Sequence, residues 1–140
     1  MAVAVERIGL IVGGEQRQAR GGATFETIDP SSSRPLAVVA QAGVEDIDYA
    51  VAVAKEAFES GPWTKMKPAE RARLLWKVAE LIRRDAEELA KTESRDNGKP
   101  LRQAKTDVEV AARYFEFYAG VADKLVGNTI PLGPGFLDYT

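Results

Sequence analysis

Residues 101–125 are expected to form a helix with two adjoining apolar stripes, and this feature constrains the fold more than any other. The main stripe follows three- and four-residue spacing: Leu101, Ala104, Val108, Ala111, Phe115, Tyr118, Ala122 and Leu125. The second stripe lies beside it: Val110, Tyr114, Phe117 and Val121. A surface helix needs only one apolar face. This helix therefore requires cover over most of its circumference.

Two more helices are expected before it. Apolar residues spaced three or four apart predict a first helix over 44–60, which ends at Gly61-Pro62 because glycine tolerates the turn and proline cannot continue the hydrogen-bond ladder. The same spacing predicts one long helix over 68–92, with Pro68 in its first turn. The middle of the chain is therefore predicted to contain three helices.

The N-terminal part of the chain is predicted to contain strands and turns. Extended stretches are expected at 8–12, 24–28 and 35–41, where β-prone or alternating residues occur, and a further one from about Glu15 toward Gln18. Gly13-Gly14 and Asp29-Pro30 have the residues of tight turns. Together these stretches predict a small antiparallel meander.

The chain divides into a β-meander at 1–43, a helical part at 44–126 and a final hairpin at 127–140, an α+β arrangement. The hairpin is expected to turn at Gly133-Pro134-Gly135 and reaches Thr140 in what reads as the middle of a strand. This ending, and the apolar surface of the third helix, indicate that part of the fold comes from elsewhere. The alternative is a compact three-helix domain with a frayed end.

The chain has no cysteine and no histidine. Disulfides, thiolate zinc sites, cysteine nucleophiles and Ser-His-Asp arrangements are therefore excluded. Charged residues also fall at helical spacing: Arg83 precedes Glu87, and Arg84 precedes Glu88, by four residues, which predicts weak exposed ion pairs. No convergent carboxylate pair is visible, which argues against a carboxylate-based hydrolase. No catalytic residue is expected in this chain.

Charge and hydropathy exclude other classes. The net charge is -2 and lacks the basic excess of a nucleic-acid binder. No apolar run is long enough for a transmembrane helix, and Glu6-Arg7 interrupts the apolar start before a secretory segment can form. We therefore expect a cytoplasmic location, with no nucleic-acid partner and no membrane contact.

Several short motifs, in order, resemble the N-terminal part of the NAD(P)-dependent aldehyde dehydrogenases. They are Phe25-Glu26-Thr27-Ile28-Asp29-Pro30, Ala57-Phe58, Pro62-Trp63, Pro68-Ala69-Glu70-Arg71-Ala72, Glu93 with Asp96-Asn97-Gly98-Lys99-Pro100, Tyr118-Ala119-Gly120-Val121-Ala122-Asp123-Lys124 and Gly127-Asn128-Thr129-Ile130-Pro131. No single motif is decisive, but their order and spacing are specific. The resemblance covers residues 10–140, the first quarter to third of a family member.

The resemblance implies an α/β fold of the aldehyde dehydrogenase type. It also implies an oxidoreductase that converts an aldehyde to a carboxylic acid with NAD or NADP, through a cysteine thiolate and a glutamate that activates water. Both residues and the Rossmann strands belong to the part of the family beyond Thr140. No Gly-x-Gly-x-x-Gly loop occurs here. The chain alone is therefore expected to bind no dinucleotide and to be inactive.

The resemblance also gives residues Thr106, Val110, Tyr114 and Phe117 a place at the substrate entrance, where apolar walls suit an aldehyde. The alternative is that this stripe is ordinary core against the missing part. The segment 127–140 resembles the start of an arm through which family subunits form homo-oligomers. The expected partners are thus the remainder of the enzyme and like subunits.

Asp96 has two interpretations. By resemblance, its carboxylate and a backbone carbonyl near Thr27 or Ile28 hold a sodium or potassium ion, since such a cation prefers oxygen ligands. The alternative is that its side chain caps the Asn97-Gly98 turn.

Two functions remain open at this stage. The chain is the N-terminal segment of an aldehyde dehydrogenase, or it is a free-standing regulatory module that binds full-length subunits of such an enzyme.

Overall fold

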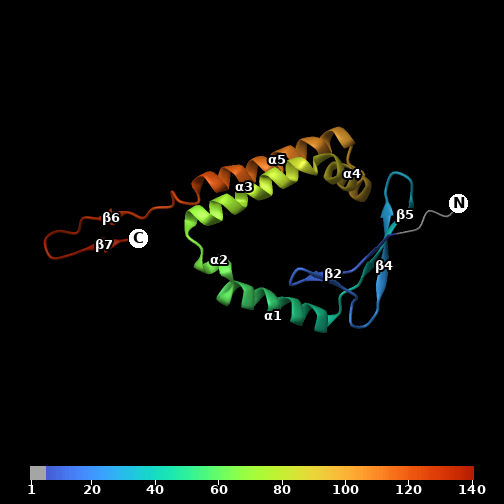
Figure 1. Ribbon diagram of the computed structural model, residues 1–140, viewed down its shortest axis with the longest axis horizontal. Helices are drawn as coiled ribbons and strands as arrows, with labels where there is room; N and C mark the ends of the chain where they lie inside the picture. Colours follow the sequence, from blue (N-terminus) through green and yellow to red (C-terminus); the bar gives the residue numbers. More distant parts are fainter. Residues whose placement is uncertain (1–5) are drawn as a thin grey trace.

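The computed structural model describes residues 6–140. Figure 1 shows α3 and α5 side by side, α4 at one end of them next to the strands, and α1 across an open space below. The helices are α1 Val44–Ser60, α2 Pro62–Lys65, α3 Pro68–Arg84, α4 Ala86–Asn97 and α5 Leu101–Val121. The strands are β1 Glu6–Ile8, β2 Leu10–Val12, β3 Glu15–Arg17, β4 Thr24–Asp29, β5 Arg34–Ala40, β6 Thr129–Ile130 and β7 Asp138–Tyr139.

The N-terminal strands form two sheets, so the prediction of a single antiparallel meander at 1–43 is wrong. β4 and β5 are antiparallel as expected, but β1 lies parallel to β5 on its other side, and β2 with β3 forms a separate hairpin. Gly9 lies between β1 and β2, where the chain passes from one sheet to the other, and a Cβ atom there would lie only 2.6 Å from the carbonyl oxygen of Arg17. Residues 1–5 of the predicted segment lie outside the described part.

The predicted long helix over 68–92 is two helices that meet at Asp85. Asp85 has φ -100° and ψ 14°, outside the helical region, and its carboxylate is engaged by the guanidinium of Arg84 at 2.7 and 2.8 Å. The backbone bonds from Asp85 to Leu81 and from Leu89 to Asp85 persist at 3.0 Å. The chain therefore changes direction at Asp85, and α4 continues beyond Thr92 to Asn97.

The buried apolar residues where α3, α4 and α5 meet are all alanines. They are Ala79 on α3, Ala90 on α4, and Ala104, Ala112 and Ala119 on α5. Small side chains let helix axes approach closely. Within residues 6–140 no large side chain is fully buried, and no helix is long and apolar enough to cross a bilayer. The second apolar stripe of α5 accordingly stays exposed, with Tyr114 at 61% and Phe117 at 62%.

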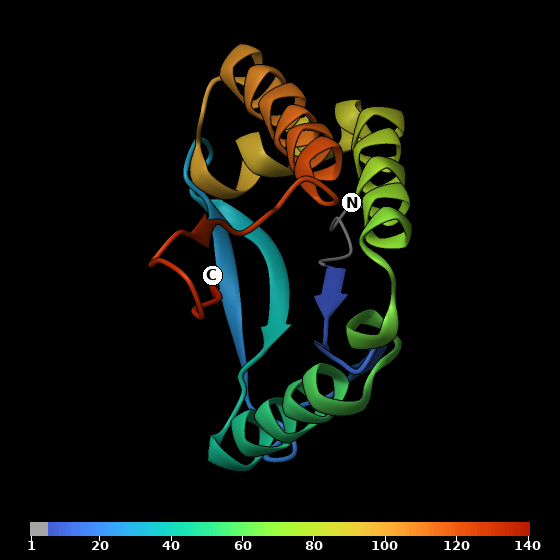
Figure 2. The same ribbon diagram turned by 90° about the vertical axis from the view of Figure 1, so that its left-hand side faces the viewer.

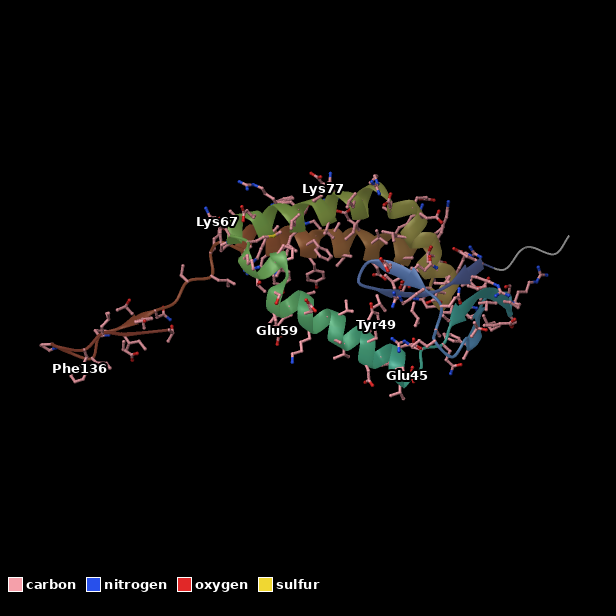
Figure 3. All side chains as sticks on the ribbon, turned by 60° about the horizontal axis from the view of Figure 1, so that its bottom comes forward. Glu45, Tyr49, Glu59, Lys67, Lys77 and Phe136 are labelled. Atoms are coloured by element: carbon pink, nitrogen blue, oxygen red, sulfur yellow. The ribbon has the colours of Figure 1, made fainter. Side chains whose placement is uncertain are left out.

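The β2–β3 hairpin is joined to α1 by a small polar cluster. The guanidiniums of Arg17 and Arg20 lie 4.7 and 5.7 Å from the ring centre of Tyr49, which Figure 3 labels on α1. The buried carboxylate of Asp46 accepts hydrogen bonds from the backbone N–H groups of Arg20 at 3.1 Å and Gly43 at 2.9 Å. The Gly43 and Arg20 N–H groups hold the pKa of Asp46 below its usual value.

The C-terminal hairpin is confirmed. β6 and β7 pair antiparallel around a turn in which Gly133 and Gly135 both have positive φ. Figure 1 shows this hairpin extending away from the helices, and Figure 2 views the molecule from the side on which the hairpin lies. Phe136 lies near the tip of the hairpin (Figure 3) with 73% of its surface exposed.

The substitution Ala112→Leu tests the alanine contact. Forcing a larger side chain between α3 and α5 is expected to lower the free energy of unfolding by about 1–3 kcal/mol. Urea denaturation measures this change. The control is Ala52→Leu on an exposed part of α1, which is expected to stay within about 0.5 kcal/mol of the original chain.

The Asp46 cluster predicts a pH dependence of stability. Because the pKa of Asp46 is lower in the folded state, its carboxylate stabilises the fold above the ordinary aspartate pKa, and this stabilisation is lost as the pH falls through the folded value. Urea midpoints measured across the acid range should therefore fall more steeply for the original chain than for Asp46→Asn. The exposed neighbour provides the control Asp48→Asn, which should retain the original slope. Equal slopes for all three chains would contradict the assignment.

Candidate functional site

Three of the four predicted entrance residues line one apolar hollow on α5. Val110, Tyr114 and Phe117 border an open depression of about 340 Å³ together with Arg113 and Tyr118. They come together because residues three and four apart share a helix face. The rings of Phe117 and Tyr118 meet edge to face, with centroids 5.3 Å apart. The hollow is open to solvent and has aromatic walls.

The fourth predicted residue, Thr106, does not line this hollow. It borders a neighbouring polar cavity with Arg102, Gln103 and Asp107. Its hydroxyl donates to the backbone carbonyl of Arg102 at 3.2 Å, one turn earlier in the helix. The structure therefore separates Thr106 from the aromatic walls.

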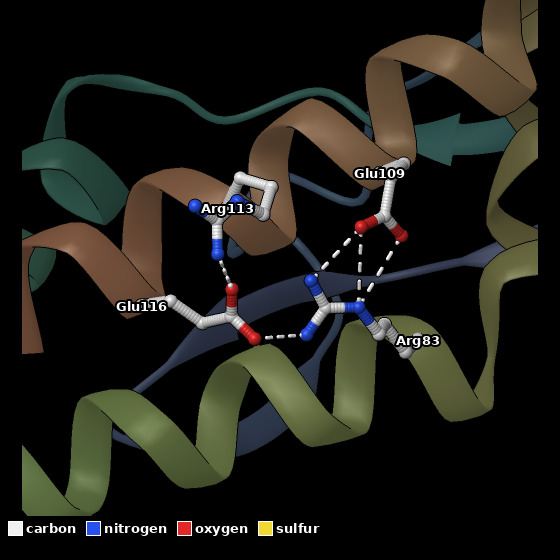
Figure 4. A network of polar contacts seen from close by, with 4 residues as sticks. All are labelled: Arg83, Glu109, Arg113 and Glu116. Atoms are coloured by element: carbon white, nitrogen blue, oxygen red, sulfur yellow. Dashed lines mark hydrogen bonds and ion pairs between the residues drawn. The ribbon is translucent and has the colours of Figure 1, made fainter.

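One rim of the apolar hollow is held by an ion-pair network between α3 and α5. Arg113 donates to Glu116 at 2.6 Å, and the other oxygen of Glu116 accepts from Arg83 of α3 (Figure 4). Arg83 also contacts Glu109 at 2.9 Å. The side chain of Glu116 is only 11% exposed, and Arg83 holds the pKa of Glu116 below its usual value. The network thus includes Arg113, which also lines the hollow.

This network also corrects the predicted surface pairs. Arg83 does not pair with Glu87, because it points across to α5, and Glu87 instead contacts Lys105 at 2.9 Å. Arg84 does not pair with Glu88, because it engages the adjacent Asp85 where α3 ends. Helical spacing could not show either partner, since α5 is distant in sequence and the helix changes direction at residue 85.

A second hollow lies between α4 and the β4–β5 pair. Thr27 and Asp96, two of the predicted cation ligands, both line this cavity of about 400 Å³, while Ile28 does not. The Thr27 hydroxyl donates to the carbonyl of Ala37 at 3.5 Å. No group of three acidic, histidine or cysteine side chains that could hold a metal occurs among the described residues. The cavity supplies oxygen donors from both sides but no complete ligand set.

The Asn97-Gly98 turn is capped by side chains other than Asp96. The Asn97 Oδ1 accepts from the N–H of Lys99 at 2.8 Å, and the hydroxyl of Ser94 donates to the Lys99 carbonyl at 2.7 Å. These two bonds cap the turn, and among the described residues no side-chain hydrogen bond from Asp96 does so. Gly98 has φ 77°, and a Cβ atom on it would lie 2.9 Å from the ring of Pro30. Only glycine fits this position without a shift.

Three charged residues, whose contacts were not predicted from the sequence, hold this turn against α5. The Lys99 ammonium contacts Glu93 on α4 at 2.9 Å and Asp107 on α5 at 2.5 Å, a group that we call the Lys99 cluster. Both carboxylates raise the pKa of Lys99. The spacing of these residues crosses a turn and follows no single helical period, so only the fold brings them together.

The comparisons with known proteins place these features in a family. The model of the aldehyde dehydrogenase family matches residues 17–140. An aldehyde dehydrogenase from Aspergillus niger is 44% identical over 133 residues, which are 95% of this chain and 27% of that protein. The chain belongs to the aldehyde dehydrogenase family.

The fold of this chain is also similar to solved structures of aldehyde dehydrogenases. The NAD+ complex of an aldehyde dehydrogenase from Bacillus cereus is 47% identical and has a TM-score of 0.90, over 96% of this chain and 28% of that one. An NAD-dependent aldehyde dehydrogenase from Sinorhizobium meliloti is 36% identical with a TM-score of 0.87, over 95% of this chain and 27% of that one. The expected aldehyde dehydrogenase fold is confirmed, and the chain spans about a quarter of the length of the relatives it matches.

The network on α3 and α5 predicts unequal effects for two adjacent arginines. Arg83→Met should lower the urea midpoint more than Arg84→Met, because Arg83 joins two helices whereas Arg84 is 67% exposed and contacts only its neighbour. Added salt should reduce the difference, since exposed ion pairs are screened. Identical midpoints for the two variants at low salt would show that the network does not stabilise the helix contact.

Proposed function

We propose that this chain is the N-terminal segment of an NAD(P)-dependent enzyme that oxidises an aldehyde to a carboxylic acid. The observation that carries the proposal is the superposition of nearly the whole chain on the first part of the Bacillus cereus enzyme, which was solved with NAD+. Within the complete enzyme to which this chain would belong, the segment serves as scaffold, as an oligomer contact and as one wall of the substrate entrance.

The segment alone is proposed to be inactive. It has no cysteine to form a covalent intermediate, and its glycine pairs lie in turns such as Gly13-Gly14 between β2 and β3. No Gly-x-Gly-x-x-Gly sequence is present. The residues of this chain thus do not fit a dinucleotide, which would be bound by the rest of the enzyme and would accept the hydride there. This chain supplies the scaffold, an oligomer contact and one wall of the substrate entrance.

A chimera tests the proposal. Residues 1–140 replace the matching N-terminal segment of the Bacillus cereus enzyme, and formation of reduced NAD is measured with an aldehyde. We expect the chimera to be active and the isolated chain to be inactive under the same conditions. A folded chimera that does not oxidise any aldehyde in a panel of aliphatic and aromatic substrates would contradict the proposal.

The apolar hollow is proposed to form part of the substrate entrance. Its walls consist of Val110, Tyr114 and Phe117, which the structure brings together and leaves accessible. Apolar walls favour the carbon chain of an aldehyde over water. The alternative is that the rest of the enzyme covers the stripe as core.

In the chimera, Tyr114→Ala is expected to change the preference between a long and a short aldehyde. Loss of an aromatic wall should shift the ratio of their kcat/KM values by about tenfold. The control is Lys105→Ala on the same helix, whose side chain pairs with Glu87 of α4, and it should leave the ratio unchanged. An unchanged ratio in Tyr114→Ala would favour the core interpretation.

The hollow between α4 and β4 is proposed to hold a sodium or potassium ion in the complete enzyme. Asp96 on α4 and Thr27 on β4 both line it, and the ligands would be the Asp96 carboxylate and a backbone carbonyl near Thr27 or Ile28. Such an ion would be structural. Anomalous scattering from chimera crystals grown in potassium tests this: a peak beside Asp96 supports it, and water alone excludes it.

The hairpin β6–β7 is proposed to be the start of an arm that joins subunits of a homo-oligomer. Its support is geometric, because the hairpin extends away from the helices with Leu137 79% and Phe136 73% exposed (Figure 1). Light scattering of the chimera and of its Phe136→Ser variant tests it. The arm predicts a smaller mean mass for the variant.

The second candidate function is a regulatory module that binds full-length subunits. The exposed apolar residues of α5 and of the final hairpin favour it, since such surfaces mark interaction sites. Titration of the isolated chain into the Bacillus cereus enzyme distinguishes the two. A fall in activity together with co-migration would support a module. The absence of both effects would support a segment of the enzyme.

A further inference from the structure

The turn after α4 contains an asparagine followed by a glycine, and the side-chain amide of this asparagine can be modified. Asn97 is followed by Gly98, and because glycine has no Cβ atom, its backbone nitrogen can approach and attack the side-chain carbonyl carbon of Asn97. The chain has one other asparagine, Asn128, and the β-branched Thr129 that follows it hinders the same reaction. Asn97 is thus the asparagine of this chain best suited to cyclise with the next residue.

The fold occupies the three atoms that this cyclisation needs. The Gly98 N–H, the nucleophile, donates to the carbonyl of Ser94 at 3.0 Å as the last helical bond of α4. The Asn97 Nδ2, the leaving group, donates to Glu93 at 2.8 Å. The Asn97 Oδ1 accepts from Lys99 N–H at 2.8 Å. Side-chain rotation toward the Gly98 nitrogen would break the last two bonds.

The Lys99 cluster keeps this arrangement closed. The Lys99 ammonium lies 2.9 Å from the same Glu93 oxygen that receives the Asn97 amide, and 2.5 Å from Asp107 on α5. Ser94, whose carbonyl holds the Gly98 N–H, also binds the Lys99 carbonyl through its hydroxyl at 2.7 Å. Opening the turn therefore requires several bonds to break together, and the contact with Asp107 links it to α5.

We propose that Asn97 is a latent deamidation site that the Lys99 cluster holds closed in the folded chain. When the turn opens, the Gly98 nitrogen forms a bond to Asn97 Cγ, and the Cγ–Nδ2 bond breaks with loss of ammonia, which takes the former backbone proton. Water then opens the cyclic imide at either carbonyl, giving aspartate or isoaspartate. The sum is amide plus water to carboxylic acid plus ammonia, with no change of oxidation state.

Deamidation of Asn97 would weaken the same contacts of the turn that slow the reaction. A carboxylate at residue 97 loses the donated hydrogen bond to Glu93 and places two like charges together. Isoaspartate also lengthens the main chain next to Gly98, which packs against the ring of Pro30. Deamidation therefore weakens the attachment of α4 to the turn after β4.

Mass spectrometry in oxygen-18 water tests the proposal with the full 140-residue chain. The chain is incubated at mildly alkaline pH, folded or in guanidinium chloride, and peptide mapping follows label uptake at residues 97 and 128. We expect Asn97 to react at least about tenfold more slowly in the folded chain, as for a site that reacts only after local opening. Asn128 serves as the internal reference. Equal folded and unfolded rates at Asn97, or no reaction in the unfolded chain, would overturn the proposal.

Variants test the role of the cluster. Lys99→Met should reduce the protection, expressed as the ratio of unfolded to folded rates, by about fivefold or more. This ratio cancels any direct effect of the side chain on the chemistry. The matched control Lys91→Met removes an exposed pair with Glu87 on the same helix and should keep the original protection.

A second variant keeps the test independent of folding. Asp107→Asn leaves the pair between Lys99 and Glu93 in place, and it should give a protection between those of the original chain and Lys99→Met. Circular dichroism verifies that each variant is folded. If Lys99→Met and Asp107→Asn are folded and show the same ratio of unfolded to folded deamidation rates as Lys91→Met, the Lys99 cluster does not hold the site closed.

Discussion

The close contact of α3 with α5 organises the helical half of this structure, and it depends on small side chains. Ala104, Ala112 and Ala119 lie along one face of α5 and are buried, so the helices meet where little apolar surface is available. The larger apolar side chains of α5 consequently face other directions. Most of the hydrophobic stabilisation that these side chains could provide depends on further cover. The exposed aromatic stripe is therefore a consequence of how the helices pack.

Charged clusters hold the joints that apolar burial does not secure. Asp46 attaches the β2–β3 hairpin to α1, Arg83 links α3 to α5, and Lys99 ties the turn after α4 to both neighbouring helices. The first two join residues 26 positions apart in the sequence, and the third spans the turn between α4 and α5. Exposed ion pairs contribute little individually, and they gain importance when several share one geometry. One of these clusters borders the apolar hollow, because Arg113 contacts the same carboxylate that binds Arg83.

The elements that could be predicted are those specified by local sequence. The 3.6-residue period of α1 and α5 and the glycines between β6 and β7 act over a few residues, and the structure confirms these elements. The parallel pairing of β1 with β5 and the break at Asp85 could not be predicted. The pairing of β1 joins residues about thirty positions apart, and the apolar stripe continues across residue 85 as if the helix were unbroken.

The same distinction holds for the candidate site. Val110, Tyr114 and Phe117 were predicted together because their spacing places them on one helix face, and the structure confirms their proximity. Thr106 lies one turn away and borders a different cavity. The Lys99 cluster was missed because it joins two helices across a turn.

Static light scattering of the isolated chain over a dilution series tests the central claim, that the aromatic face of α5 lacks sufficient cover. An exposed apolar face of this kind predicts self-association, with a mean mass that exceeds 15.2 kDa and rises with concentration. A mean mass of 15.2 kDa at every concentration would contradict the claim. The face would then be stable in water and would need no other part of an enzyme to cover it.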